Sequence, residues 1–127
     1  KLTQLTWLRL TANQLTDVSS LKGLTQLKQL FLSFNQITDL SPLAGLTQLI
    51  NLDLWENQIT DVSALAGLDQ LEKLFLGTNQ ITNVSGLSEL KRLKELHLKD
   101  NPSIPTAQID ELQKALPECE IVHNATK

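Results

Sequence analysis

The sequence predicts an α/β solenoid, in which copies of one short unit stack into an elongated domain. Asparagine recurs every 22 residues, at Asn13, Asn35, Asn57, Asn79 and Asn101. A fixed spacing of leucines precedes each one, as Leu30 and Leu32 precede Asn35. A single unit cannot bury its own apolar face, whereas about three or more stacked units share a continuous core. Five units are present, so we expect one domain with a parallel sheet along one side.

Each unit is expected to begin with a short strand around its paired leucines, which in the second unit is Gln29 to Ser33. Side chains alternate along a strand, so the leucines point into the core and the residues between them point outward. The asparagine ends the strand, and its amide can both donate and accept hydrogen bonds. We therefore expect a buried asparagine column that satisfies backbone groups of neighbouring units.

After the asparagine, an apolar residue such as Ile37 returns to the core, and a short turn follows. A serine occupies the expected N-cap of each turn, at Ser19, Ser41, Ser63 and Ser85. The turns are long enough for little more than one turn of 3₁₀ helix, and Pro42 fits the first helical position. An acidic column precedes the serines, at Asp17, Asp39 and Asp61. We expect these carboxylates to cap the turns, because a calcium site needs several oxygens converging from one loop.

The C-terminal segment departs from the frame. The one stretch long enough for a full α-helix is Ala107 to Leu116, with Thr106 as its expected cap and Pro117 as its stop. We divide the domain into repeats at 1–104 and a C-terminal helix–strand cap at 105–127. The first four residues align with the tail of a repeat, so we expect the chain to open inside a repeat.

A sixth strand is expected around Ile121, with Cys119 in the place of a core leucine. Glu118 and Glu120 would then face outward, where charge discourages pairing at a sheet edge. Because Cys119 is the only cysteine, no internal disulfide can form, and its inward position predicts an inert core thiol. A single free cysteine favours a reducing compartment such as the cytoplasm.

The repeat reads L-x-x-L-x-L-x-x-N-x-[IL], and it resembles the 22-residue leucine-rich repeats of the bacterial internalin-like and SDS22-like type. The resemblance covers almost the whole chain, including a terminal L-P-x-C-x-[IV] segment like the cap of such proteins. It implies a right-handed horseshoe with the sheet on the concave face and 3₁₀ or other short turns on the convex face. It also implies protein binding, as an adhesion module, a regulatory subunit or the sensor arm of a larger protein, and it leaves a cell-surface location open.

Composition and motifs argue against several other functions. The chain has 11 basic against 14 acidic residues, which does not suit a protein that follows nucleic-acid phosphates. No apolar run approaches the roughly 18 residues of a membrane span. Phosphate-loop, HExxH and CxxC motifs are absent, so we expect no cofactor, no metal and no catalysis. An enzyme would require a pocket uniting His97 with Glu95 and Asp100. A monomer is expected rather than an obligate oligomer.

All five aromatic residues fall at outward strand positions or just beyond a strand. Together with interleaved charges they form the predicted partner-binding set: Trp7, Arg9, Phe31, Phe34, Asp53, Trp55, Glu56, Lys73, Phe75 and His97. Clustered exposed aromatics with charges are typical of protein interfaces. Since Asp53 lies inside the aromatic group, we expect a matching partner to present apolar side chains around a Lys or Arg.

Two alternatives remain open for the same residues. The rings could pack on one another and serve only to stabilise the sheet. The surface could instead bind carbohydrate, with Trp7 and Trp55 stacking on sugars while Arg9, Asn51 and Asp53 bond hydroxyl groups.

Overall fold

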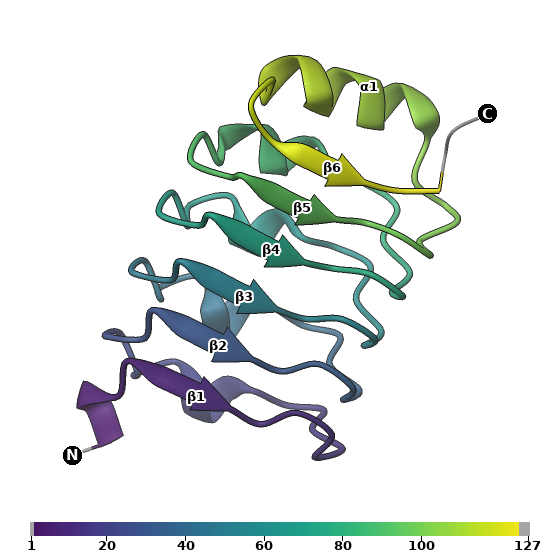
Figure 1. Ribbon diagram of the computed structural model, residues 1–127. Coiled ribbons are helices and arrows are strands. Elements are labelled where there is room, and N and C mark those ends of the chain that lie inside the picture. The colour runs from purple at the N-terminus through teal and green to yellow at the C-terminus, as the bar shows by residue number, and fades with distance from the viewer. Residues whose placement is uncertain (1, 125–127) are drawn as a thin grey trace.

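The computed structural model describes residues 2–124 and shows one curved stack of repeats (Figure 1). Six parallel strands form a single sheet in chain order. They are β1 (Trp7–Arg9), β2 (Gln29–Phe31), β3 (Asn51–Asp53), β4 (Lys73–Phe75), β5 (Glu95–His97) and β6 (Glu120–Val122). The predicted right-handed solenoid is confirmed.

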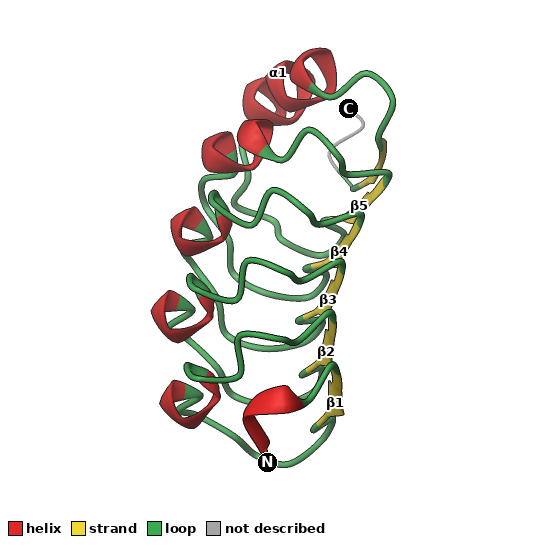
Figure 2. Ribbon diagram, turned by 90° about the vertical axis from the view of Figure 1, so that its left-hand side faces the viewer, coloured by secondary structure: helices red, strands yellow, loops and turns green. Residues whose placement is uncertain are grey.

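Short helical turns cover the opposite side of the stack. They are η1 (Leu2–Gln4), η2 (Ser19–Leu21), η3 (Ser41–Leu43), η4 (Ser63–Leu65) and η5 (Ser85–Glu89), followed by the helix α1 (Thr106–Ala115). Figure 2 shows the strands along the inner side of the curve and the helical turns along the outer side. The sheet is therefore the concave face.

The strands pair without a register slip. Leu30 of β2 lies beside Leu52 of β3, which lies beside Leu74 of β4. All three are fully buried in the core, as are most leucines of the repeat frame. A shift of one residue would turn every leucine to solvent, so the leucine pattern fixes the pairing. In the first repeat the corresponding Leu8 and Leu10 are only partly buried.

The strands are shorter than predicted, because β2 ends at Phe31 rather than Ser33. The backbone hydrogen bonds nevertheless continue, and the Phe34 N–H donates to the Trp55 carbonyl at 2.9 Å. The chain then leaves the extended conformation, because Phe34 has a φ of +59°. The corresponding residues of the other repeats, Ala12, Glu56, Thr78 and Asp100, share this left-handed conformation.

The prediction that serines cap the turns is wrong. Each of these serines is the first residue of its 3₁₀ turn and makes no side-chain cap. The side chain that accepts the serine N–H lies two residues earlier, as Asp61 Oδ1 does for Ser63 at 2.9 Å. The residue between them, here Val62, occupies the N-cap position one residue before the serine and is buried in the core, so the polar cap lies two residues before the serine. The predicted capping role of the acidic column is thus confirmed.

The same one-residue difference occurs at the C-terminal helix. Thr106 is the first residue of α1 rather than its cap, and Pro105 occupies the N-cap position without a side-chain hydrogen bond. The helix ends at Ala115, one residue before the predicted end. Helix boundaries depend on local hydrogen bonds to this degree, so the existence and type of the element are confirmed.

The buried asparagine column is confirmed. Asn57 Oδ1 accepts the Ile37 N–H at 3.0 Å, while its amide nitrogen donates to the Leu32 and Leu54 carbonyls at 3.1 Å each. One side chain therefore ties its own strand end to the preceding repeat. Asn35, Asn79 and Asn101 repeat this arrangement. Asn13 is exposed, and within residues 2–124 its amide nitrogen donates to the Thr11 carbonyl alone.

The end of the stack agrees with the predicted cap over the described residues, while 125–127 of the expected range lie outside them. Ile121 of β6 pairs with Leu96 of β5, and Glu118 and Glu120 are exposed as predicted. Cys119 is 4% exposed, which confirms a core thiol. Burial raises the pKa of this thiol to about 11, and the charges of Glu120 and Glu95 add to the effect.

Candidate functional site

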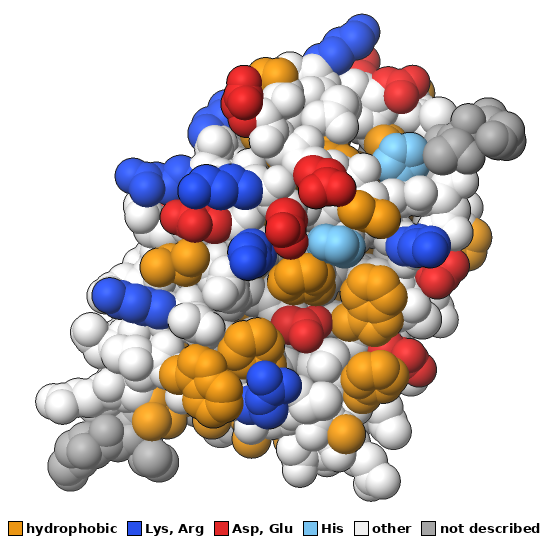
Figure 3. Space-filling view, viewed as in Figure 1, with side chains coloured by type: hydrophobic (Ala, Val, Ile, Leu, Met, Phe, Trp, Pro, Cys, Tyr) orange, Lys and Arg blue, Asp and Glu red, His pale blue; other side chains and the backbone are white. Residues whose placement is uncertain are grey.

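The outward residues of β1 to β5 line up as the repeat frame predicts. Phe31 lies beside Asp53, Asp53 beside Phe75, and Phe75 beside His97. Figure 3 shows hydrophobic side chains gathered over β1 to β4, with acidic and basic side chains among them. We call this surface the concave patch, and it comprises Trp7, Arg9, Phe31, Phe34, Asp53, Trp55, Phe75 and His97.

One end of the concave patch is a cation–π cluster on β1 and β2. The Trp7 and Phe31 rings are 5.8 Å apart at an interplanar angle of 52°. The Arg9 guanidinium carbon lies 4.6 Å from the Phe31 ring centroid and 5.6 Å from that of Trp7. Both distances are within the range over which a cation is attracted to the face of an aromatic ring. Trp7 remains 49% exposed, so much of its ring is free for another contact.

The other end is a ring stack on β4 and β5. The His97 imidazole stacks on Phe75 with centroids 4.7 Å apart, and the Trp55 ring lies 6.4 Å from His97. His97 Nε2 lies 3.7 Å from Glu95 Oε1. The histidine therefore belongs to the aromatic surface, with a carboxylate of the same strand beside it.

Asp53 lies between these two clusters. Its Oδ1 accepts the Trp55 backbone N–H at 3.1 Å, and the side chain is half-buried. Burial raises the pKa of Asp53, while the hydrogen bond from Trp55 and the positive charges of Arg9 and His97 offset part of that effect. The concave patch thus holds a partly desolvated carboxylate among aromatic rings.

An open hollow of about 510 Å³ lies over this carboxylate. It is lined by Phe31, Ser33, Phe34, Asp53, Trp55 and Phe75. Phe34 is 51% exposed and holds its left-handed backbone through the hydrogen bond to the Trp55 carbonyl. The left-handed backbone conformation costs free energy for a residue other than glycine, and it persists only where the surrounding contacts hold the residue in place. The turn therefore presents the Phe34 ring at the rim of the hollow.

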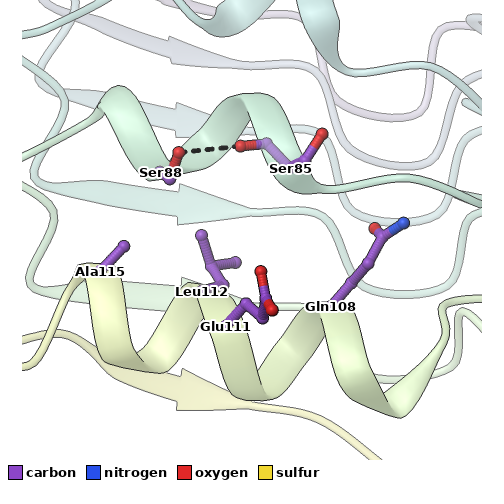
Figure 4. Close-up of a pocket in the computed structure, with 6 residues that line it drawn as sticks. All are labelled: Ser85, Ser88, Gln108, Glu111, Leu112 and Ala115. Carbon is purple, nitrogen blue, oxygen red and sulfur yellow. Dashed lines mark hydrogen bonds between the residues drawn. The ribbon is translucent and has the colours of Figure 1, made fainter.

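A second hollow of about 210 Å³ lies between η5 and α1 (Figure 4). Ser85, Ser88, Gln108, Glu111, Leu112 and Ala115 line it. Several of its polar groups are used within the fold, since Ser88 Oγ donates to the Ser85 carbonyl and Gln108 Oε1 accepts the Val84 N–H. The Gln108 bond joins α1 to the last regular repeat, and the Ser88 bond lies within η5, so this hollow is a packing seam.

The structure brings together eight of the ten predicted site residues and leaves two apart. Lys73 and Glu56 are exposed, and neither is among the residues that line the hollow. Sequence reasoning missed the role of Gly77. A Cβ at this position would lie 2.6 Å from Trp55 Cε3, so the glycine leaves room for the Trp55 ring. The available signal was a glycine at the position one repeat after Trp55, so that no side chain stands beside the indole ring. It also missed Ser33, which is 6% exposed and lines the hollow.

Two further structural findings bear on the kind of site. Over residues 2–124, no group of three or more His, Cys, Asp or Glu side chains is placed to hold a metal ion. No helix in this range has the length and apolar character needed to cross a membrane.

Comparison with known proteins gives a family and several solved structures. The family model described as leucine-rich repeats in two copies matches residues 3–45 and 47–89. An internalin C2 of Listeria monocytogenes is 39% identical with a TM-score of 0.90, over 96% of this chain and 53% of its own. Another internalin of that bacterium is 33% identical with a TM-score of 0.80, over 90% of this chain and 35% of its own.

A leucine-rich repeat protein of Leptospira interrogans is likewise 33% identical, with a TM-score of 0.83, over 91% of this chain and 30% of its own. The chain thus spans about half or less of the length of these proteins. A comparison with curated proteins gives no match. With five asparagine-framed repeats, a parallel concave sheet and these matches, the chain belongs to the leucine-rich repeat family and is of the internalin-like type.

Proposed function

We propose that this chain is a non-catalytic module that binds a partner protein through its concave sheet face. Leucine-rich repeat proteins are generally protein-interaction modules, and the concave patch is the proposed contact surface. The main support is the gathering of every aromatic side chain of the chain on one face. Aromatic side chains and Arg are enriched at protein interfaces, and Trp, Tyr and Arg dominate their binding energy.

Packing between the rings does not account for all of this surface. Phe75 and His97 cover one another, and so do Phe31 and Arg9. Trp7 and Phe34, however, each leave about half of their surface exposed. A large exposed aromatic side chain gains little for the fold, whereas its burial against a partner is favourable. We infer that the concave patch is kept for contact.

The similar proteins suggest a role within a larger assembly. They are internalins and a further bacterial leucine-rich repeat protein, and each is longer than this chain. We propose that the module acts as the adhesion, regulatory or sensor arm of a larger protein. Binding of carbohydrate is less well supported, because the Trp7 and Trp55 rings each lie beside another ring, Phe31 and His97 respectively, in tilted pairs rather than as separate flat platforms for a sugar.

Affinity capture with three baits tests the proposal. The wild-type chain, Trp55→Ala and Lys22→Ala should each be immobilised, and captured proteins quantified by mass spectrometry. Lys22 is an exposed residue at the end of η2 on the convex face, so its change is the matched control. We expect a protein that is enriched by the wild type and by Lys22→Ala but lost with Trp55→Ala.

Equal capture by all three baits would show that the concave face is not the interface. A glycan-array signal that Trp55→Ala abolishes, with no captured protein, would support the carbohydrate alternative instead.

A further inference from the structure

We propose that the hollow of the concave patch receives an arginine side chain of the partner protein. Its guanidinium would stack on the patch rings and pair with the Asp53 carboxylate. This inference rests on the proposed function, since it specifies the chemistry of the partner at the same surface.

The first support is the unpaired charge of Asp53. Among the described residues, its carboxylate receives one hydrogen bond, from the Trp55 N–H, and forms no ion pair with a basic side chain. Arg9, whose charge acts on Asp53 without forming an ion pair, lies against the Phe31 ring instead. A half-buried carboxylate without a cation is costly, and that cost is removed when a cation binds. The hollow lies directly over this group.

The second support is that the patch already binds a guanidinium on one of its rings. The Arg9 guanidinium carbon lies 4.6 Å from the Phe31 ring centroid. Trp55 and Phe75 line the same hollow as Phe31 and offer further ring surface around Asp53. Rings of this kind attract cations through their faces, and the attraction increases when the cation is desolvated.

The third support distinguishes arginine from lysine. A guanidinium is planar, stacks on rings and binds a carboxylate through two parallel hydrogen bonds. It is also hydrated more weakly than an ammonium group, so it loses less on entering an apolar hollow. The exposed ring of Phe34 stands at the rim, where it can contact apolar atoms of the partner on either side of the arginine.

Titration with small peptides tests this inference without the natural partner. The probe is acetyl-Gly-Arg-Gly-amide, and its analogue with citrulline keeps the shape while removing the charge. The indole N–H signals of Trp55 and Trp7 in the nitrogen-15 NMR spectrum report on the hollow and on its neighbouring cluster. We expect the arginine peptide to shift the Trp55 signal saturably, and the citrulline and lysine peptides to bind at least about tenfold and threefold more weakly, respectively.

A charge-removing variant localises the effect. Asp53→Asn keeps an oxygen that can accept the Trp55 N–H and removes only the charge. Asp61→Asn is the matched control on the convex face, because Asn83 already makes the equivalent hydrogen bond to Ser85 in the next repeat. We expect Asp53→Asn to weaken binding of the arginine peptide at least about tenfold and Asp61→Asn to leave it unchanged.

Three results would overturn the inference: an unmoved Trp55 signal at the highest arginine peptide concentration, equal binding of the citrulline peptide, or unchanged binding to Asp53→Asn. Its failure is distinct from failure of the proposed function. A captured partner that is lost with Trp55→Ala but kept with Asp53→Asn would leave the concave interface standing without the arginine. Capture that survives Trp55→Ala would overturn the proposed function, whatever the peptide does.

Discussion

The asparagine column gives a stability prediction whose size follows from the structure. In Asn57→Ala, the Ile37 N–H loses its acceptor at 3.0 Å, and the Leu32 and Leu54 carbonyls lose a donor at 3.1 Å each. Asn57 is buried, so water cannot readily replace these bonds. Leaving a buried polar group unsatisfied costs about 1–3 kcal/mol, and we expect Asn57→Ala to lower the free energy of unfolding by that amount.

Urea unfolding followed by circular dichroism measures this change. With a typical dependence of about 1–3 kcal/mol per molar urea, the midpoint should fall by roughly 1 M. Asn13→Ala is the matched control, because Asn13 occupies the same column but is exposed and its amide donates one local bond. We expect its effect to stay within about 0.5 kcal/mol. Equal midpoints for Asn57→Ala and the wild type would refute the bridging role of the column.

Three further predictions concern single side chains. Cys119 should resist thiol reagents at neutral pH in the folded chain and react once urea unfolds it, because burial raises its pKa to about 11. Gly77→Ala should displace the Trp55 ring, change its fluorescence and weaken partner binding, while the core and the unfolding midpoint change little. Asp53→Asn should be at least as stable as the wild type at pH 7. Since the folded-state pKa of Asp53 is raised, its ionised form disfavours folding above that pKa, and the difference between the two proteins should vanish as the pH falls below the ordinary value of 3.8.

The columns of the concave face could be predicted from the sequence because the repeat length is constant. A 22-residue period with paired leucines places Phe31, Asp53 and Phe75 side by side once the leucines are buried. The same reasoning located the buried asparagines and the inward Cys119. These features follow from periodicity and alternation alone.

The features that sequence reasoning missed depend on backbone angles and side-chain rotamers, which a repeat pattern does not contain. The left-handed backbone of Phe34 is unusual for a bulky residue, so the residue type at this position does not indicate it. The stacking of His97 on Phe75 and the position of Trp55 over Gly77 depend on rotamers chosen between neighbouring strands. The predicted serine caps are wrong because a buried Val or Leu occupies the N-cap position, so the polar group that reaches the turn lies two residues before the serine.

Phe75→Ala tests the central claim, that the concave patch is a binding surface. Its affinity for the captured partner and its urea midpoint should be measured on the same samples, beside Lys22→Ala. We predict at least about tenfold weaker binding, the loss expected of a hot-spot aromatic, with a nearly unchanged midpoint. Normal binding by Phe75→Ala would contradict the claim, and a markedly lowered midpoint would show that the ring serves the stability of the sheet instead.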